Sequence, residues 1–427
     1  MQNSKFNSIL ERIEKNRLPS IPEIKNSIHP FYQGFSIANL PASISSWFGI
    51  PETGNPRLDP LIADQFQSEY QNVILLLVDG LGLKLFERLF DEKSKSDHSI
   101  IRNEGAVFPL TSITPSTTSA ALTTLWTGRL PAEHAYIGYE LFLKEFGLIA
   151  NMITHQVASI MEEPVNIKRA GFHPAAFLDV PTLGDHFRKN KIHPFSFQHD
   201  SIYSSGLSEM LLQNVEQIPF SDKEDLWNAC LRILSKYRNE RAYLYIYWSG
   251  LDTASHHDGP ESDDVFGGLK DFVFSLEGFL EKLSQNGQKD TLFILTADHG
   301  QIGTEIKPDY ELRNHPELLE NLIMQPTGES RMPFLYLKRN SEDHVRDYLD
   351  SHWDNQFLML KSDEVLESCL LGDGNMSLST RDRFGSHVVF TQGNVYWWWP
   401  KKENHLLGRH GGLSRDEMLV PLYLLEI

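Results

Sequence analysis

The sequence predicts an α/β protein with a mostly parallel central sheet that carries helices on both faces. Three long apolar runs, at residues 72–82, 242–252 and 291–300, each end in polar residues, a pattern typical of strands buried on both faces. Helix-like segments lie between them, such as residues 263–287, where apolar residues recur every three or four positions and Gly287 predicts the end of the helix. Strands that alternate with helices along a chain indicate parallel pairing.

Four segments follow one another along the chain. Residues 1–70 begin with a polar amphipathic helix pattern that ends at Pro19 and continue with chain rich in Pro, Ser and Asn, which we expect to wrap the core. The core itself is expected over residues 71–340. A more polar stretch between two strand-like runs predicts a small inserted cap subdomain at 341–385, after which 386–427 completes the core.

The charge balance excludes several classes of partner. The 427 residues include 57 acidic and 39 basic ones, which gives a formal net charge of −18. Broad nucleic-acid or anionic-membrane surfaces need basic patches, so we expect neither a nucleic-acid polymer nor a membrane as partner. A small anionic substrate is compatible with this charge, because bound metal cations can reverse the local field.

Cysteine usage and the lack of targeting patterns predict a cytoplasmic protein. The two cysteines, Cys230 and Cys369, are too few for a disulfide framework and do not form a CxxC metal motif. The N-terminus lacks the apolar stretch and the small-residue cleavage site of a secretory signal. The sequence also has no run of about 18 apolar residues, the length that a membrane-spanning helix requires.

Each of the three long strand-like runs ends in an aspartate: Asp79, Asp252 and Asp298. Any one of them alone would be explained as a turn former or a helix cap. In open α/β sheets, however, ligands bind beyond the carboxyl ends of the strands, so three acids at such ends can converge on one point. The sequence therefore predicts a shared acidic site at this edge of the sheet.

Three histidines accompany these acids. His256 follows Asp252 by four residues, which places both side chains on one face of a helical turn. His299 directly follows Asp298, and His410 lies in GRHGG, where the glycines let the backbone approach a site closely. Carboxylates and imidazoles without a thiolate suit Zn²⁺, with Mn²⁺, Fe²⁺ and Co²⁺ as alternatives. Six ligands are too many for one catalytic metal with an open position and suit two metals.

A hydroxyl-rich stretch at residues 111–131 is the candidate for the nucleophile. Pro115, Ser116 and Thr117 form a helix start signal, and small and apolar residues follow. A hydroxyl at a helix start faces free backbone N–H groups and the positive end of the helix dipole, a position that receives phosphate well. Taken alone, the same residues would be explained equally well as a Ser/Thr-rich helix cap.

The motifs in their order along the chain are VDG, PSTTSAALTTLWTGRLPAEH, DTASH, TADHG and GRHGG. Together they resemble the alkaline phosphatase superfamily, and most closely its type I phosphodiesterase/nucleotide pyrophosphatase family. The resemblance extends from roughly residue 72 to the C-terminus and has no counterpart in the first 70 residues. It implies an alkaline phosphatase-like fold and a hydrolase of phosphoric ester or pyrophosphate bonds, which forms a phosphothreonine at a two-metal site.

The resemblance also implies a role for each motif residue. One metal would be held by Asp252, His256 and His410, and the other by Asp79, Asp298 and His299 together with the nucleophile. Counting back from Thr127-Gly128 implies that Thr118 is the nucleophile and a ligand of the second metal. Thr117 is the alternative, because the run of hydroxyl residues allows a slip of one position.

Substrate contacts are implied less directly. Relatives that act on nucleotides carry an asparagine soon after the TG-x-x-P segment, and this chain has Tyr139 at that place. Arg129 and Arg409 flank the motifs and are candidates for phosphate contacts, with surface or structural pairing as the alternative. VYWWWP, at residues 395–400, is interpreted either as a stacking platform for a nucleobase or as packing at the edge of the cap.

Two other functions use the same residues. A phosphomonoesterase or a phosphonate hydrolase would need the same site as a phosphodiesterase. A catalytically silent, metal-stabilised binding scaffold is the alternative from another class of protein. The complete set of ligands together with a hydroxyl favours an enzyme with a small-molecule phosphoester substrate.

Overall fold

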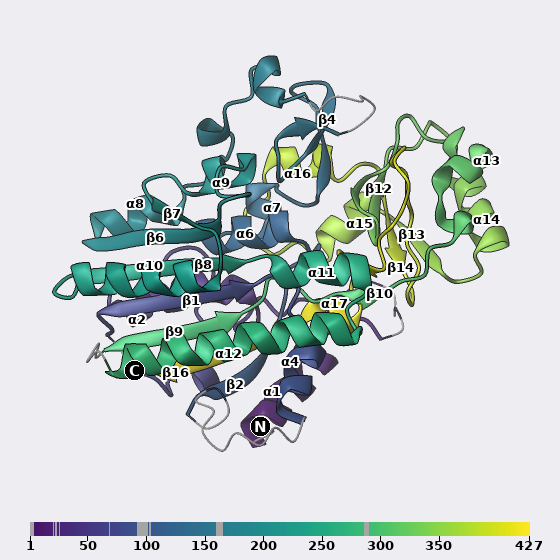
Figure 1. Cartoon of the computed structure of the whole chain (residues 1–427). Helices are drawn as coiled ribbons and strands as arrows, with labels where there is room; N and C mark the ends of the chain where they lie inside the picture. The colour runs from purple at the N-terminus through teal and green to yellow at the C-terminus, as the bar shows by residue number, and fades with distance from the viewer. Residues whose placement is uncertain are drawn as a thin grey trace.

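The computed structural model describes residues 4–19, 21, 24, 26–67, 69–91, 101, 104–158, 165–285 and 290–427. Within them the chain forms a central sheet, a second sheet and a two-stranded ribbon, with helices packed around both larger sheets (Figure 1). The predicted helix end at Gly287 lies outside the described residues; the helix is described up to Gln285. None of the described helices is long and apolar enough to cross a membrane.

The central sheet has seven strands in the order β2-β16-β9-β1-β8-β6-β7. Their bounds are β1 (Asn72–Val78), β2 (Ala106–Thr111), β6 (Ile192–His199), β7 (Glu216–Phe220), β8 (Arg241–Trp248), β9 (Thr291–Thr296) and β16 (Leu419–Glu426). β1 pairs in parallel with β8 and β9, and β6 pairs in parallel with β7 and β8, whereas β16 is antiparallel to β2 and β9. This mostly parallel arrangement confirms the predicted fold class.

The three long apolar runs form the middle of this sheet. β1 and β9 are buried at every position, and β8 at every position except its two ends. Strands that are apolar on both faces bury their side chains fully only between two layers. The helices that provide these layers are α2 (Leu40–Trp47), α6 (Thr118–Thr127), α10 (Lys223–Lys236), α11 (Gly250–Asp258) and α12 (Asp263–Gln285).

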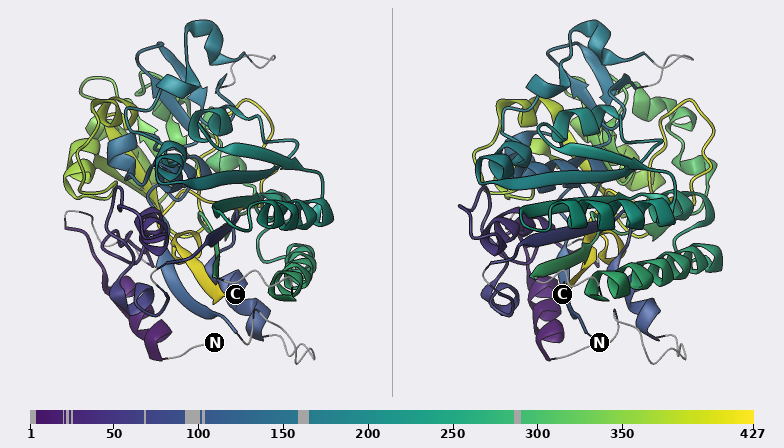
Figure 2. Two further views of the ribbon diagram at one scale, coloured as in Figure 1. Left: turned by 90° about the vertical axis from the view of Figure 1, so that its left-hand side faces the viewer. Right: turned by 60° about the vertical axis from the view of Figure 1, so that its left-hand side comes forward.

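Aromatic side chains hold the layers together. On one side of the sheet, Trp126 of α6 packs edge-on against Tyr245 of β8, with ring centroids 5.1 Å apart. On the other side, Trp227 of α10 stacks on Phe279 of α12 at 4.9 Å. Figure 2 shows the sheet between these two helical layers.

The N-terminal segment lies against the edge of the central sheet. α1 (Ser4–Lys15) buries Phe6, Ile9 and Ile13 and packs beside β2 (Figure 2). The contact is possible because the apolar residues of this helix recur on one face, as its sequence pattern predicts. The helix therefore covers an edge strand of the sheet.

The second sheet is antiparallel and has the strand order β13-β14-β12-β11-β3-β4-β5. Its strands are β3 (Glu140–Leu143), β4 (Leu148–Asn151), β5 (Gln156–Val157), β11 (Thr327–Glu329), β12 (Met332–Leu335), β13 (Phe357–Lys361) and β14 (His387–Thr391). The segment 341–385, which we predicted to be a cap, contributes β13 to this sheet, together with α14 (Glu342–His352), α15 (Ser362–Glu367) and α16 (Leu378–Arg383). The other strands come from before and after that segment.

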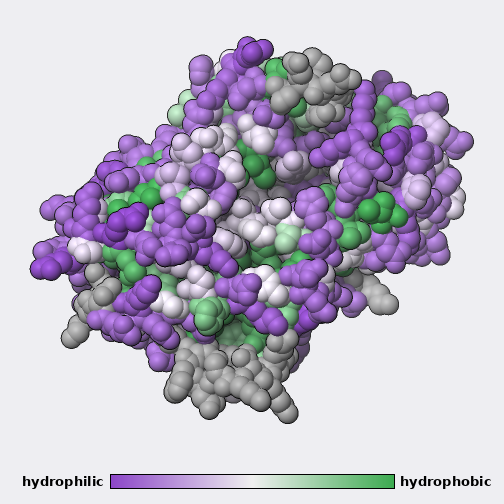
Figure 3. All heavy atoms as spheres, viewed as in Figure 1, coloured by the Kyte–Doolittle hydropathy of each residue, from purple (hydrophilic) through white to green (hydrophobic). Residues whose placement is uncertain are grey.

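Shorter elements complete the described chain. They are α3 (Pro60–Ala63), α4 (Leu83–Asp91), α7 (Pro131–His134), α8 (Leu183–Lys189), α9 (Gly206–Leu211), α13 (Pro316–Leu319), α17 (Arg415–Met418), β10 (Ile302–Gly303), β15 (Gly408–Arg409) and the 3-10 turns Ile37–Asn39, Ile167–Ala170, Pro174–Ala176, Pro308–Tyr310 and Leu312–Asn314. The face seen in Figure 3 is mainly hydrophilic, with apolar residues in small groups. Such a surface agrees with the acidic composition of the chain.

Candidate active site

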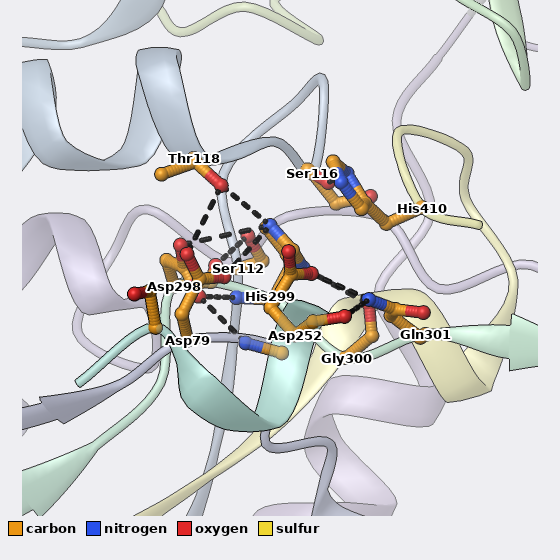
Figure 4. Close-up of polar contacts among 12 residues, drawn as sticks. Asp79, Ser112, Ser116, Thr118, Asp252, Asp298, His299, Gly300, Gln301 and His410 are labelled. Carbon is orange, nitrogen blue, oxygen red and sulfur yellow. Dashed lines mark hydrogen bonds and ion pairs between the residues drawn. The ribbon is translucent and has the colours of Figure 1, made fainter. Parts of the chain in front are cut away.

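The three aspartates at the strand ends meet in space. The parallel register pairs Val78 with Trp248 and Leu77 with Thr296, so β1, β8 and β9 end at the same level. Asp79 directly follows β1, Asp298 lies just beyond β9, and Asp252 lies in the first turn of α11, which follows β8. The common register therefore brings together residues that are far apart in the sequence (Figure 4).

Asp79, Asp298 and His299 form an inner cluster beside the predicted nucleophile. One ligand atom of each lies within 4.8 Å of the others. His299 Nε2 is 3.6 Å from Asp79 Oδ1 and 3.6 Å from Asp298 Oδ2. Thr118 Oγ1 lies 3.1 Å from His299 Nε2 and 3.5 Å from Asp79 Oδ2.

Asp252 and His410 form an outer cluster that shares His299 with the inner one, because their ligand atoms also lie within 4.8 Å of one another. The rings of His299 and His410 stack with centroids 3.8 Å apart. His256, which the resemblance assigns to the same shell as Asp252, places its Nε2 3.4 Å from Asp252 Oδ2. The structure thus brings all seven predicted metal-site residues together, with His299 at the boundary between the two groups.

The three imidazoles are oriented in the same way. Each Nδ1 lies within hydrogen-bonding distance of a backbone carbonyl: His256 with Gly408 O at 2.8 Å, His410 with Ser116 O at 3.1 Å, and His299 with Gly300 O at 3.1 Å. A carbonyl only accepts, so each Nδ1 carries the hydrogen and each Nε2 keeps its lone pair. This is the tautomer of a histidine that binds a metal through Nε2.

The electrostatics of the aspartates agree with a cation site. Burial raises the pKa of Asp79 well above its ordinary value, and the neighbouring Asp252 and Asp298 raise it further. Asp79 Oδ1 and Asp298 Oδ2 are buried and have no hydrogen-bond partner among the described residues. Buried carboxylate oxygens without a donor are costly unless a cation compensates them, so this pair fits a metal ion.

In the outer cluster the neighbouring histidines lower the pKa of the carboxyl group, whereas the pKa of Asp79 in the inner cluster is raised. Burial raises the pKa of Asp252, but His256, His410 and His299 outweigh that effect and hold it below its ordinary value. Burial and the neighbouring His299 lower the pKa of His410 well below its usual range. Both directions favour the forms in which these side chains bind metals, an ionised carboxylate and a neutral imidazole.

Hydrogen bonds from neighbouring groups hold the three aspartates in place. The Tyr247 hydroxyl donates to Asp79 Oδ2, and Gln301 Nε2 donates to Asp252 Oδ1. The backbone N–H groups of Gly80 and His299 donate to Asp298 Oδ1 at 3.2 and 2.9 Å. The sequence analysis missed Tyr247 and Gln301; Gln301 directly follows the TADHG motif, whereas nothing local distinguishes Tyr247 from the other tyrosines of its strand.

The predicted nucleophile lies at the start of a helix. Thr118 is the first residue of α6, and Thr117 is its N-cap residue, but the Thr117 side chain makes no capping hydrogen bond. The first N–H groups of a helix have no partner within the helix, so the positive end of α6 faces the inner cluster. This arrangement supports the binding of an anion next to Thr118.

A cavity of about 530 Å³ opens over Thr118 and the outer cluster. Thr118, Asp252, His256 and His410 line one part of it. The other part is lined by polar and aromatic side chains, which include Tyr139, Glu140, Asn151, Glu329, Trp397, Trp398, Trp399 and Lys402. The sequence analysis identified Tyr139 and the tryptophans, but it missed Asn151 and Glu329, which no motif marks.

Arg129 is not brought to this cavity, which corrects the expected phosphate contact. It follows the far end of α6 from Thr118, and a helix of this length separates its two ends by about 15 Å. Its guanidinium donates instead to Glu133 at 3.2 Å. Arg409 does line the cavity, but its guanidinium lies over the Tyr396 ring, 3.6 Å from the centroid, and donates to Asn404.

The tryptophan stretch has two different environments. Trp397 is fully buried and stacks on Phe357 of β13 at 5.1 Å, a packing contact beside the second sheet. Trp399 is partly buried, lines the cavity and donates its Nε1–H to Glu140 at 2.9 Å. The Trp397 contact is the packing that one interpretation of this stretch expects, and stacking on a nucleobase stays a prediction.

Comparison with known proteins identifies the family. The family description "Type I phosphodiesterase / nucleotide pyrophosphatase" matches residues 73–412. The chain belongs to this family. The match confirms the resemblance that the motifs indicated, and members of this family are metal-dependent hydrolases of phosphoric ester or pyrophosphate bonds. The acidic and imidazole groups described above could hold a metal in this member.

Solved structures share the fold of this family member. Murine ectonucleotide pyrophosphatase/phosphodiesterase 5 aligns with a TM-score of 0.58 at 16% identity, over 82% of this chain and 87% of that one. It has also been solved as an inactive threonine-to-alanine variant with AMP. Phosphonoacetate hydrolase from Sinorhizobium meliloti 1021, in complex with phosphonoacetate, gives 0.58 at 17% identity over 82% and 89%. No curated protein sequence matches the chain significantly.

Proposed function

We propose that this family member hydrolyses phosphodiester or pyrophosphate bonds through a phosphothreonine on Thr118, at a site for two divalent cations. The observation that supports this most directly is the position of Thr118 Oγ1. It lies at the N-terminus of α6 and within 3.1 Å of His299 Nε2 and 3.5 Å of Asp79 Oδ2. One hydroxyl thus meets an anion-binding helix end and a set of metal-type ligands.

The chain offers two ligand sets. Asp79, Asp298 and His299 would hold one cation beside Thr118, and Asp252, His256 and His410 would hold the other. The mixture of carboxylates and imidazoles favours Zn²⁺, with Mn²⁺, Fe²⁺ and Co²⁺ as alternatives. When bound, the cations would lower the pKa of the threonine hydroxyl and neutralise charge on the phosphoryl oxygens.

The residues of the chain then carry out a two-step displacement. The Thr118 hydroxyl gives its proton to solvent, and Oγ1 attacks phosphorus. The bond from phosphorus to the leaving oxygen breaks as the Oγ1–P bond forms, and that oxygen leaves with the electron pair and takes up a proton from solvent. The N–H groups and the dipole of α6 stabilise the negative phosphoryl oxygens during this step. Water then hydrolyses the phosphothreonine and restores the hydroxyl.

The cavity supports a substrate with a sizeable leaving group. Its volume of about 530 Å³ exceeds what a phosphoryl group alone needs, and Tyr139, which is 40% exposed, presents an aromatic ring to it. AMP is the ligand of the inactive murine relative. We therefore propose small phosphodiesters or nucleotide pyrophosphates as the substrate class.

A phosphonate hydrolase is the second candidate. Lys402 lines the cavity, and its ammonium group offers a partner for a carboxylate on the leaving side of a substrate. Phosphonoacetate, the ligand of the Sinorhizobium meliloti enzyme, carries such a carboxylate. A substrate comparison separates the two candidates.

The test compares wild type with Thr118→Ala, Thr118→Ser and Thr117→Ala. The substrates are bis-p-nitrophenyl phosphate, p-nitrophenyl phosphate and phosphonoacetate, and metal content is measured for each protein. We expect Thr118→Ala to lower kcat by about 10³-fold or more while it retains most of the metal. Undiminished turnover by this variant overturns the proposal, and complete loss in Thr117→Ala instead would move the nucleophile to Thr117.

A further inference from the structure

Ser116 forms hydrogen bonds with three consecutive residues of the GRHGG segment. Its backbone carbonyl accepts the Nδ1–H of His410 at 3.1 Å. Its hydroxyl donates to the Gly412 carbonyl at 2.8 Å and accepts the N–H of Gly411 at 3.2 Å. Ser116 is fully buried and lies beside His410 (Figure 4). One residue thus satisfies three polar groups of the loop that carries the last predicted metal ligand.

The same residue lies directly before the start of α6. Ser116 precedes Thr117, the N-cap residue, and Thr118 is the first residue of the helix. Adjacent Cα atoms are about 3.8 Å apart, so those of Ser116 and Thr118 are separated by at most about 7.6 Å. The three hydrogen bonds of Ser116 therefore connect the loop of His410 to the segment that carries the proposed nucleophile.

A second buried residue, Glu417, holds the same loop. Its Oε1 accepts the N–H of Gly412 at 2.9 Å. The guanidinium of Arg331 donates to both oxygens of this carboxylate, at 3.0 and 2.8 Å. The N–H of Gly412 thus bonds to Glu417 and its carbonyl to Ser116, so both of its backbone polar groups have buried partners.

The two glycines after His410 are closely packed. A Cβ atom on Gly411, whose φ is +106°, would lie 2.5 Å from Glu329 Cβ. A Cβ atom on Gly412 would lie 2.9 Å from both carboxylate oxygens of Glu417. Only glycine fits this backbone, and glycine is also the residue with the largest conformational freedom. The course of the loop therefore depends on the hydrogen bonds that hold it.

The position of His410 matters for the outer cluster. The Ser116 carbonyl binds Nδ1 and leaves Nε2 free for a metal. The His299 ring stacks on the other imidazole with centroids 3.8 Å apart, and its ligand atom lies within 4.8 Å of those of Asp252 and His410. Metal ions bind their ligands at distances defined to about 0.2 Å, so a displaced His410 would weaken the binding of a cation there.

We propose that Ser116 is a positioning residue that holds His410 in place for the outer cation. The carbonyl orients the imidazole, and the hydroxyl fixes the two glycines that follow it. Ser116 does not line the cavity, so it acts through His410 and makes no contact with the substrate. No covalent bond forms or breaks at Ser116. This inference rests on the proposed site for two cations and does not require the phosphothreonine.

The test compares zinc binding by Ser116→Ala with that by a matched control, Ser43→Ala. Ser43, in α2, is also buried, and its hydroxyl donates to the Asn39 carbonyl and accepts the Leu58 N–H, both at 2.8 Å. Neither Asn39 nor Leu58 lines the cavity. Each variant loses one donated and one accepted hydrogen bond to buried backbone, but only Ser116→Ala releases a loop with a predicted metal ligand.

Zinc affinity is measured by competition with a chromophoric chelator, and thermal unfolding is measured for the same proteins. Loss of a residue that orients a metal ligand should raise the Kd of one of the two zinc ions by about 10- to 100-fold in Ser116→Ala, whereas Ser43→Ala should stay within about twofold of wild type. His410→Ala removes the ligand itself. In that background the addition of Ser116→Ala should change zinc affinity little, because residues that act through one another are not additive.

Equal zinc affinity of Ser116→Ala and Ser43→Ala overturns the inference. So does an effect of Ser116→Ala that is as large in the His410→Ala background as in wild type. If Ser116→Ala does not fold, two other variants decide. Ser116→Thr keeps the hydroxyl and should bind zinc like wild type, whereas Ser116→Cys, with a weakly bonding thiol, should bind one zinc ion less tightly; equal affinity of these two overturns the inference. A wild-type protein that binds fewer than two zinc ions, or an active Thr118→Ala, would instead refute the proposed function itself.

Discussion

Replacement of Asp298 by asparagine should change the stability of the protein in opposite directions with and without metal. Asp298 Oδ1 accepts two backbone N–H groups, and an asparagine oxygen can accept the same bonds. Asp298 Oδ2 is buried without a partner and faces His299 Nε2 at 3.6 Å, in the cluster that also holds Asp79. An amide NH₂ at that place supplies a donor and removes one negative charge beside Asp79.

The expected shifts in Tm follow from the size of the chain. Unfolding entropy of about 2.1 cal/mol/K per residue gives about 0.9 kcal/mol/K for 427 residues, so 1 kcal/mol shifts Tm by about 1 °C. Relief of a buried unsatisfied carboxylate is worth about 1–3 kcal/mol, so metal-free Asp298→Asn should melt about 1–3 °C above metal-free wild type. A metal at a thousandfold excess over its Kd adds about 4 kcal/mol to wild type, or about 4–5 °C per site.

The assay is calorimetric unfolding of both proteins after treatment with a chelator and after addition of Zn²⁺. Asp298→Asn should lose the contribution of the inner site, so it should melt below wild type when metal is present and above it when metal is absent. Measurement of bound metal in the same samples verifies the loading. If Asp298→Asn is the less stable protein under both conditions, the carboxylates do not repel one another and the interpretation of the cluster is refuted.

Three further predictions test the support of the site. Tyr247→Phe removes the hydroxyl that donates to Asp79. Because a hydrogen bond to a charged group is worth about 1.5–3 kcal/mol, this variant should lower kcat/KM by about 10- to 100-fold with little change in Tm. Unchanged kinetics would contradict the prediction. Arg331 binds Glu417 at 3.0 and 2.8 Å, so Arg331→Met leaves a buried carboxylate without its partner. The free energy of unfolding should fall by about 3–5 kcal/mol, measured by thermal unfolding. The double variant Arg331→Met, Glu417→Gln should recover part of that loss. Metal-free protein should lose stability as the pH rises through the interval from 4.5 to about 8, because burial raises the pKa of Glu329 and the folded state keeps a proton that the unfolded state releases; Glu329→Gln should show a flatter profile in the same titration of Tm.

The chemistry of the site could be predicted because its residues are adjacent to recognisable local patterns. Asp79, Asp252 and Asp298 directly follow apolar runs, and the parallel sheet that such runs imply brings their ends together. His256 was found by its spacing from Asp252 on a helical turn. The helix start marked the hydroxyl-rich stretch, and the family resemblance implied Thr118 within it, with Thr117 as the alternative. These signals span a few residues each, which is the range over which backbone propensities act.

Other residues of the site could not be found in this way. Tyr247 lies on a strand with several tyrosines, and its contact with Asp79 depends on which face of β8 meets β1. Glu329 meets the backbone of a residue 190 positions away in the sequence, and no local pattern indicates such a contact. Arg129 is close to Thr118 in the sequence, but the length of α6 separates the two residues, and Arg129 makes the structural pair with Glu133 that was the alternative to a phosphate contact.

The sequence by itself determined the α/β architecture and the set of three carboxylates, three imidazoles and a hydroxyl, because both depend on periodicity and on the residues at element ends. Tertiary structure alone decided that His299 lies between two ligand groups, that all three imidazoles present Nε2, and that Glu329 lines the cavity. These features depend on contacts between segments far apart in the sequence, such as His410 with Ser116 and His256 with Gly408, in which each contact is fixed by many others at once.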